Sequence, residues 1–172
     1  MTFKSPFLAS FLKNPRRVGS VAPSSKNLAR HIAAVVDQMP TYDVIELGAG
    51  SGAISSELIA HRPTLVEIDE TLSESLRIAF PLLQVVCGCA ISFLQNLEQP
   101  SGLILSIPTI NNPDGARLIS TVKRCYQLGL IPWCVTYSYG PFSPLRNANF
   151  QRQSRHSLVL GNLPPAFVWS YA

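Results

Sequence analysis

The sequence lacks long hydrophobic runs and has few charged side chains. Only 14% of its 172 residues are Asp, Glu, Lys or Arg, whereas 47% are hydrophobic. The longest apolar stretches, residues 103–107 and 128–135, are much shorter than the roughly 18 residues that a membrane-spanning helix needs. A chain of this length suits a single domain with its own hydrophobic core. We therefore expect no segment that crosses a bilayer.

A secretory signal is also missing. The apolar stretch at residues 6–12 is too short for the core of a signal peptide, and basic residues follow it instead of a cleavage site. We therefore expect a cytoplasmic protein with reduced cysteines. Cys87 and Cys89 form a C-x-C pair on an expected strand, but no second pair or nearby histidine completes four metal ligands. The sequence predicts no metal site, and burial is the expectation for all four cysteines, Cys87, Cys89, Cys125 and Cys134.

Acidic residues are absent before Asp37, although the preceding 36 residues carry six cations. Pro6 can start a short helix that Pro15 ends, with phenylalanines at four-residue steps along one side. We predict that residues 1–23 form a basic amphipathic segment that binds an anionic membrane surface, because each cation there adds about 1 kcal/mol. The expected membrane-binding residues are Lys4, Phe7, Phe11, Lys13, Arg16 and Arg17. Two alternatives are that the apolar stripe packs on the protein core and that the cations bind RNA.

A second cluster of cations in the last third of the chain also lacks acidic neighbours. Segments of a single charge sign suggest a polyanionic partner, either nucleic acid or anionic lipid. The cluster consists of Arg117, Lys123, Arg124, Arg146, Arg152 and Arg155.

Strand and helix patterns alternate along the chain, which predicts an α/β layer fold with a mostly parallel sheet. Strands are expected at residues 42–47, 64–69, 82–88, 102–107 and 131–139, and a final hairpin from residues 156–160 and 166–171. Helices are expected at residues 25–38, 53–60, 72–80, 90–97 and 114–127. Ser24 or Ser25 can cap the first helix, and Thr71 with Glu74 forms a capping box for the third.

The stretch "ELGAGSG" lies at the first strand–turn–helix junction. Gly48, Gly50 and Gly52 allow a tight turn and close approach of the backbone to a ligand. Glu67 ends the next strand, 19 residues after Gly48. A carboxylate at that place can accept hydrogen bonds from the hydroxyls of a ribose, so the sequence predicts a nucleotide site.

Glu46, directly before the glycines, indicates which nucleotide. A pyrophosphate would favour a helix N-terminus free of acids. A buried carboxylate at this point suits a cationic ligand and is costly without a partner. S-adenosylmethionine carries both a sulfonium and an ammonium, so we predict this cofactor and not a dinucleotide.

"VIELGAGSG" followed by "VEID" resembles the first two motifs of class I S-adenosylmethionine-dependent methyltransferases. "FLKNPRRVGSVAPSS", "TYSYGP" and "NLPPAFVWSY" resemble the soluble bacterial phosphatidylethanolamine N-methyltransferases, which are related to rRNA adenine dimethyltransferases. The resemblance covers nearly the whole chain. It implies a Rossmann-like fold with a mostly parallel seven-stranded sheet, helices on both faces and a C-terminal antiparallel hairpin, with residues 24–172 as the methyltransferase domain.

The resemblance also implies roles for individual residues. Glu46 and the three glycines would hold the methionine part, Glu67 the ribose, and Ile68 the adenine ring. Residues 18–25 would fold over the cofactor. The full expected cofactor-binding set is Glu46, Gly48, Gly50, Gly52, Glu67, Ile68, Cys89, Ala90 and Ser106.

Two departures from the family pattern concern binding. Such enzymes place Gly-Asp-Ala after the third strand, whereas this chain has Gly88-Cys89-Ala90. A thiol is a weak acceptor, so we expect cofactor affinity roughly ten- to a hundredfold lower. RNA adenine enzymes carry an Asn-Leu-Pro-Tyr type sequence after the fourth strand, and here it is "SIPT". Without an aromatic ring at this point to stack a base, we expect base methylation to be disfavoured.

The predicted reaction is methyl transfer to the amine of phosphatidylethanolamine at the cytoplasmic membrane face. No general base is apparent, and His31, His61 and His156 are interpreted as structural or solvated. Tyr139, past the fifth strand, is the candidate for orienting the amine. The alternatives are an RNA (adenine) or small-molecule methyltransferase, and a cofactor-binding or membrane-associated protein that has lost catalysis.

Overall fold

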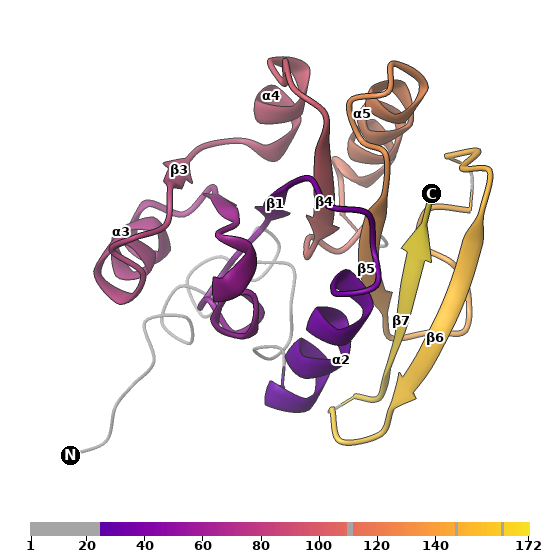
Figure 1. Cartoon of the computed structure of the whole chain (residues 1–172), viewed down its shortest axis with the longest axis horizontal. Coiled ribbons are helices and arrows are strands. Elements are labelled where there is room, and N and C mark those ends of the chain that lie inside the picture. The colour runs from indigo at the N-terminus through magenta and orange to yellow at the C-terminus, as the bar shows by residue number, and fades with distance from the viewer. Residues whose placement is uncertain (1–24, 110–111, 147, 163) are drawn as a thin grey trace.

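The computed structural model describes residues 25–109, 112–146, 148–162 and 164–172, which form a seven-stranded sheet covered by helices (Figure 1). The strand order is β3-β2-β1-β4-β5-β7-β6. β1 to β5 run parallel, and β7 lies antiparallel between β5 and β6. The predicted fold class, including the C-terminal hairpin at the sheet edge, is confirmed.

The strands are short, as expected for a sheet enclosed by helices. Their bounds are β1 Asp43–Leu47, β2 Thr64–Glu67, β3 Val85–Cys87, β4 Ser101–Leu105, β5 Cys134–Ser138, β6 Gln153–Val159 and β7 Ala166–Tyr171. The helices are α2 Lys26–Val36, α3 Glu70–Ala79, α4 Ala90–Gln95 and α5 Gly115–Gln127, with single 3₁₀ turns η1 Ser55–Glu57 and η2 Ile59–His61.

The sheet separates two layers of hydrophobic core. Side chains alternate along each strand, so Val44 of β1 faces α2 while Ile45 and Leu47 face α4 and α5. The α2 layer contains Trp133, whose indole N–H donates to the Pro40 carbonyl at 2.9 Å. The opposite layer contains Trp169. Burial on both faces explains why the parallel strands are continuous apolar runs in the sequence.

The helix predicted for residues 53–60 is wrong, because the chain there forms only η1 and η2. Both are closed by hydrogen bonds between residues three apart, such as the 3.1 Å bond from the Leu58 N–H to the Ser55 carbonyl. Pro63 disfavours the right-handed helical conformation at the residue before it, and Arg62 is indeed left-handed, with φ of 47°. The backbone therefore leaves the right-handed helical region at Arg62, directly before β2.

The start of α3 also differs from the prediction. The side chain of Asp69 accepts from the Leu72 N–H at 3.0 Å and caps the helix two residues before the predicted Thr71. Glu74, the expected partner in the capping box, instead forms an ion pair with Arg77 at 3.1 Å. The cap of α2 is Ser25, one of the two serines predicted, and Gly129, with φ of 74°, follows α5 as predicted.

The predicted membrane-binding residues Lys4, Phe7, Phe11, Lys13, Arg16 and Arg17 lie outside the described residues, as do residues 18–24 of the expected entrance segment. In the part of the chain that is described, no helix has both the length and the apolar character to span a bilayer.

Candidate functional site

The candidate site lies where the strand order reverses. β1 has β2 on one side and β4 on the other. The connections from β1 to β2 and from β3 to β4 both leave the sheet at the carboxyl ends of the parallel strands. In open α/β sheets ligands bind at this point, outside the carboxyl ends of the strands. The register places Leu47 beside both Val66 and Leu105, and Glu67 beside Cys87. The predicted residues Glu46, Glu67, Cys89 and Ser106 are thus brought to one edge.

The glycine turn after β1 depends on left-handed backbone. Gly48, Gly50 and Gly52 have φ of 77°, 57° and 78°, a region that costs other residues roughly 1–2 kcal/mol. A Cβ on Gly48 would lie 2.5 Å from Cγ1 of Ile107, and one on Gly52 would lie 2.5 Å from Cε2 of Phe80. The tight turn is confirmed. At Gly48 and Gly52 the close approach is made by the protein's own side chains.

Glu46 is completely buried at the end of β1. Its Oε2 accepts from the hydroxyl of Ser55 at 2.6 Å, whereas Oε1 is buried with no hydrogen-bond partner among the described residues. Loss of hydration raises the pKa of Glu46 to about 8, and the negative charge of Glu67 adds to this rise. The carboxyl group therefore has one oxygen available for a polar ligand, and a cation that binds there would displace the proton of the neutral acid.

Ser106 provides a second buried polar atom without a partner. It directly follows β4, and its N–H donates to the Leu47 carbonyl at 2.9 Å, which fixes it beside the glycine turn. Its Oγ is buried and has no partner within the described part of the chain. Burying an unpaired polar group costs about 1–3 kcal/mol. Two such atoms at the ends of adjacent strands indicate a polar ligand, and an ammonium group would suit Oε1 of Glu46.

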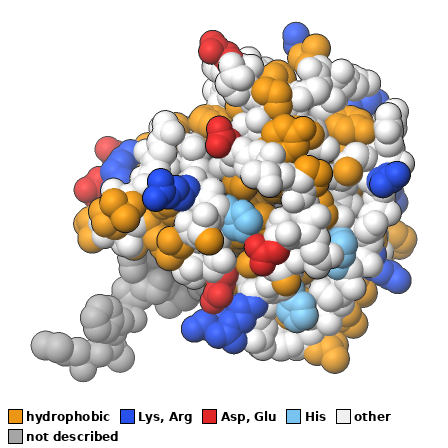
Figure 2. Space-filling model, viewed as in Figure 1, with side chains coloured by type: hydrophobic (Ala, Val, Ile, Leu, Met, Phe, Trp, Pro, Cys, Tyr) orange, Lys and Arg blue, Asp and Glu red, His pale blue; other side chains and the backbone are white. Residues whose placement is uncertain are grey.

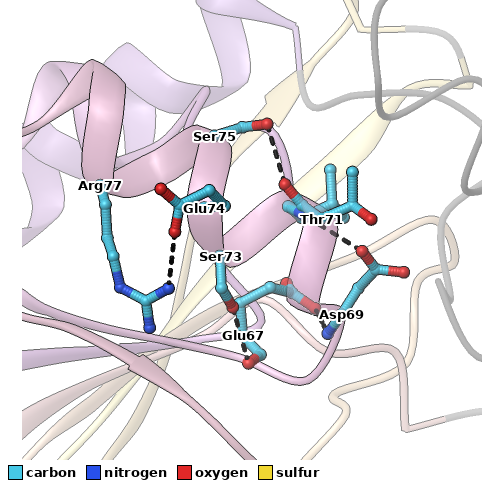
Figure 3. A network of polar contacts seen from close by, with 8 residues as sticks. Glu67, Asp69, Thr71, Ser73, Glu74, Ser75 and Arg77 are labelled. Carbon is cyan, nitrogen blue, oxygen red and sulfur yellow. Dashed lines mark hydrogen bonds and ion pairs between the residues drawn. The ribbon is translucent and has the colours of Figure 1, made fainter.

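Glu67 is 7% exposed at the end of β2, close to the first residues of α3 (Figure 3), and its side chain hydrogen-bonds the glycine turn. Its Oε2 accepts from the Gly50 N–H at 2.8 Å, and Oε1 accepts from the N–H groups of Ile68 at 2.8 Å and Asp69 at 3.0 Å. The hydroxyl of Ser73 in α3 donates to the Glu67 carbonyl at 3.2 Å. A carboxylate has about four acceptor positions, so about one remains, enough for one ribose hydroxyl.

The predicted adenine contacts lie on the turns after β2 and β3. Ile68 is 57% exposed, which leaves its apolar side chain available to a flat ring. Ala90 is buried and begins α4, so its N–H has no acceptor within the helix. Cys89 precedes it as the N-cap residue, and backbone N–H groups in the first turn, chiefly that of Ser92, lower the pKa of its thiol.

The prediction of burial is wrong for two of the four cysteines. Cys87 and Cys89 are exposed, since β3 is an edge strand that ends at Cys87. Cys89 lines an open cavity of about 800 Å³ between β3 and α4. Cys125 and Cys134 are buried, as predicted, and burial raises the pKa of both thiols. Within the described ranges no group of three or more His, Cys, Asp or Glu side chains could hold a metal ion.

Tyr139 directly follows β5, which pairs with β4, so it lies near the same sheet edge as Ser106. It is 38% exposed and packs edge-on against Tyr137, with ring centroids 5.7 Å apart. The histidines make structural contacts, as predicted. His61 forms a hydrogen bond with Asp37 at 2.8 Å. His31 and His156 form hydrogen bonds with serine hydroxyls of the terminal hairpin.

Sequence analysis missed Ser55, which orients Glu46, and missed Phe80 and Ile107, which close the glycine turn. A spacing of nine residues between a carboxylate and a serine does not indicate a contact between them. The helix expected at residues 53–60 would also have pointed the Ser55 side chain in a different direction. The only signal was the hydroxyl-rich pair Ser55 and Ser56 directly after the turn.

No protein-family model matches the chain. Two curated relatives are named ribosomal RNA small subunit methyltransferase A. The one from Chlorobium chlorochromatii is 27% identical over 105 residues, which cover 57% of this chain and 40% of the relative. The one from Chlorobium limicola is 29% identical over 120 residues, covering 64% and 44%. The chain therefore spans less than half the length of these relatives.

A solved structure extends the similarity to the fold. The 23S rRNA methyltransferase ErmE superposes with a TM-score of 0.63 at 20% identity, covering 86% of this chain and 68% of that chain. At this identity the match concerns the fold alone.

Proposed function

We propose that this chain, which has the class I methyltransferase fold, binds S-adenosylmethionine and transfers its methyl group to RNA. The observation that carries the proposal is the pair of buried, unpartnered atoms, Oε1 of Glu46 and Oγ of Ser106, beside a left-handed glycine turn. These atoms can bind a cationic and hydrogen-bonding ligand, which a dinucleotide phosphate is not.

The residues of the site would divide the cofactor among them. Oε1 of Glu46 would bind the ammonium group, the last acceptor position of Glu67 would bind a ribose hydroxyl, and Ile68 would cover the adenine. When bound, S-adenosylmethionine supplies an electrophilic methyl group on sulfur. The site residues then act mainly by positioning and by excluding water, since the transfer moves a charge without creating one.

RNA is favoured over phosphatidylethanolamine as the acceptor. Both curated relatives and the solved structure reported above are named as rRNA methyltransferases. The phospholipid interpretation gains no support from these comparisons. The predicted membrane-binding segment that motivated it, residues 1–23, lies outside the described residues. Within RNA we propose an exocyclic base amine, and adenine follows from the resemblance to rRNA adenine dimethyltransferases.

Two residues would hold the acceptor. Oγ of Ser106 can accept a hydrogen bond from the amine, which directs the nitrogen lone pair toward the methyl group, and the methylated amine then loses one proton to solvent. The family's stacking tyrosine is replaced by Thr109, so the half-exposed ring of Tyr139 is the available stacking surface. Stacking of a base on an aromatic side chain contributes about 1–3 kcal/mol. We also propose a cytoplasmic location, where RNA and cofactor meet.

The test is transfer of a labelled methyl group from S-adenosylmethionine to ribosomal RNA or to phosphatidylethanolamine vesicles. We expect label in RNA alone, and cofactor binding by calorimetry. Glu46→Gln should weaken cofactor binding about ten- to a hundredfold, the value of a charge-assisted hydrogen bond. Glu98→Gln, the same change at an exposed acid, is the matched control.

Three results would reject parts of the proposal. Label in the lipid alone would restore the phospholipid methyltransferase. Cofactor binding without transfer to either acceptor would favour a small-molecule acceptor or a protein without catalysis. No cofactor binding at all would remove the enzyme interpretation.

A further inference from the structure

Charge is divided along this chain more sharply than its net charge of +4 suggests. All ten acidic residues lie between Asp37 and Asp114, a segment that contains only two cations, Arg62 and Arg77. The residues after Asp114 contain six cations and no acid. These cations lie in α5, in the connection from β5 to β6 and in the terminal hairpin. The last third of the fold is therefore uniformly basic.

These three segments pack on one another on the α4–α5 side of the sheet. The ring of Tyr126 in α5 lies 4.3 Å from that of Phe150 in the connection, and its hydroxyl accepts from the Gln151 N–H at 3.1 Å. Phe150 in turn lies 5.2 Å from Tyr171 of β7. Cations from all three segments can therefore act on one partner. We call this surface the basic face, formed by Arg117, Lys123, Arg124, Arg146 and Arg155.

The basic face lacks internal neutralisation. None of its five cations forms an ion pair with any described carboxylate. In Figure 2 the Lys and Arg side chains on the side where β6 lies have no Asp or Glu among them. Arg117 and Arg124 are seven residues apart and share one exposed side of α5. An unscreened surface of one sign attracts a polyanion.

Aromatic rings hold two of the arginines in place. The guanidinium carbon of Arg155 lies 5.2 Å from the ring centroid of Phe167 and 5.9 Å from that of Trp169. That of Arg146 lies 5.9 Å from Phe142, which is 66% exposed. A guanidinium stacked on a ring keeps its N–H edge free for two parallel hydrogen bonds to a phosphate. Little side-chain entropy is then lost on binding.

We propose that the basic face binds the RNA backbone and leads the strand to the methyl-transfer site; this rests on the proposed function. Four of its five cations are arginines, which bind phosphates in a fixed geometry, and the exposed rings of Tyr139 and Phe142 can stack unpaired bases. Tyr139 joins the face to the site, because it begins the connection at the edge where β4 and β5 end.

The test compares two triple variants of the full chain. Arg124→Gln, Arg146→Gln and Arg155→Gln remove one cation from each segment of the basic face. Arg30→Gln, Arg62→Gln and Arg77→Gln remove three exposed cations, one from α2, one directly after η2 and one from α3. Both variants keep residues 1–24 and the same net charge, so any contribution of the N-terminal cations is equal in the two.

Binding of a fluorescein-labelled single-stranded RNA is measured by anisotropy at several salt concentrations. Each lost phosphate contact reduces the magnitude of the slope of log K against log salt by about 0.7. The loss of three contacts in the basic-face variant should therefore reduce this magnitude by about 2. The variant should also bind RNA about 50-fold more weakly at 0.15 M salt. The control variant should bind like the wild type. Cofactor affinity, measured separately by calorimetry, should not change in either variant.

An unchanged RNA slope in the basic-face variant would overturn this proposal even if the protein methylates RNA. The proposal would also be overturned if the wild type binds anionic vesicles but not RNA. If the basic-face variant then loses vesicle binding, the basic face binds lipid. Failure of cofactor binding in the wild type would instead reject the proposed function, and the RNA measurement would still decide the basic face.

Discussion

Cys89 has two structural roles that a substitution would separate. Cys89 is the N-cap of α4, with no side-chain hydrogen bond that caps the helix. We also propose, from the resemblance to class I methyltransferases, that residue 89 lies beside the adenine of the cofactor. A carboxylate there would accept from backbone N–H groups of the first turn and from the adenine amine. Its charge would also interact favourably with the helix N-terminus.

We therefore expect Cys89→Asp to bind S-adenosylmethionine about ten- to a hundredfold more tightly, as measured by calorimetry. Cys89→Ser is the control, because a hydroxyl caps α4 but accepts more weakly from adenine. Both variants should unfold at a higher urea concentration than the wild type, since a new cap contributes about 1 kcal/mol. Tighter binding in both, or in neither, would show that residue 89 does not meet the adenine.

The chemical nature of single site residues was more predictable than their contacts. An acid before a glycine turn, and a second acid at the end of the next strand, follow from Glu46, Glu67 and the strand pattern. The sequence did not indicate that backbone N–H groups already occupy most acceptor positions of Glu67, because that depends on the path of the turn around Gly50.

At the scale of elements, the turn after β1 is the part of the site that we expect to be most sensitive to substitution. Gly52→Ala would place a methyl group against Phe80 and force a left-handed conformation, so we expect a loss of about 2–4 kcal/mol in the free energy of unfolding. Urea unfolding followed by circular dichroism measures it. Gly140→Ala, with no atom within 4 Å of the new methyl, should change stability by less than about 0.5 kcal/mol. Equal effects in the two variants would contradict the packing described for Gly52.

The sequence predicted an element correctly where the residues of that element determine its structure, and incorrectly where contacts with other residues determine it. Strands such as β1 and β4 are apolar runs buried on both faces, so their pattern is sufficient. Residues 53–60 also have a helical pattern, but the Glu46–Ser55 hydrogen bond and Pro63 restrict them to two 3₁₀ turns. Similarly, Thr71 with Glu74 satisfies the capping pattern, yet Asp69 lies closer to the end of β2 and caps α3 first.

At the scale of the whole molecule, the buried Glu46 should make stability depend on pH. Between pH 4.5, its ordinary pKa, and about 8, the folded chain keeps a proton that the unfolded chain releases. The free energy of unfolding therefore falls as pH rises through this range, by about 5 kcal/mol from this group. In Glu46→Gln the contribution disappears.

Urea unfolding of wild type and Glu46→Gln at pH 5, 6.5 and 8, without cofactor, tests this expectation. The two proteins should have similar stability at pH 5, and the variant should be the more stable at pH 8. Curves that stay parallel across the range would show that the carboxyl group is hydrated or paired in the folded protein. Glu98→Gln again serves as the control, and its curve should follow that of the wild type.

The placement of Trp133 and Trp169 on opposite sides of the sheet gives the protein a built-in pair of optical probes. These are its only tryptophans, so replacing either one by phenylalanine leaves the emission of a single indole. Trp133 would then report when α2 separates from the sheet, and Trp169 when α5 and the basic face do. Coincident emission changes would mean that both layers melt as one cooperative unit, and separate changes would identify the layer that loosens first.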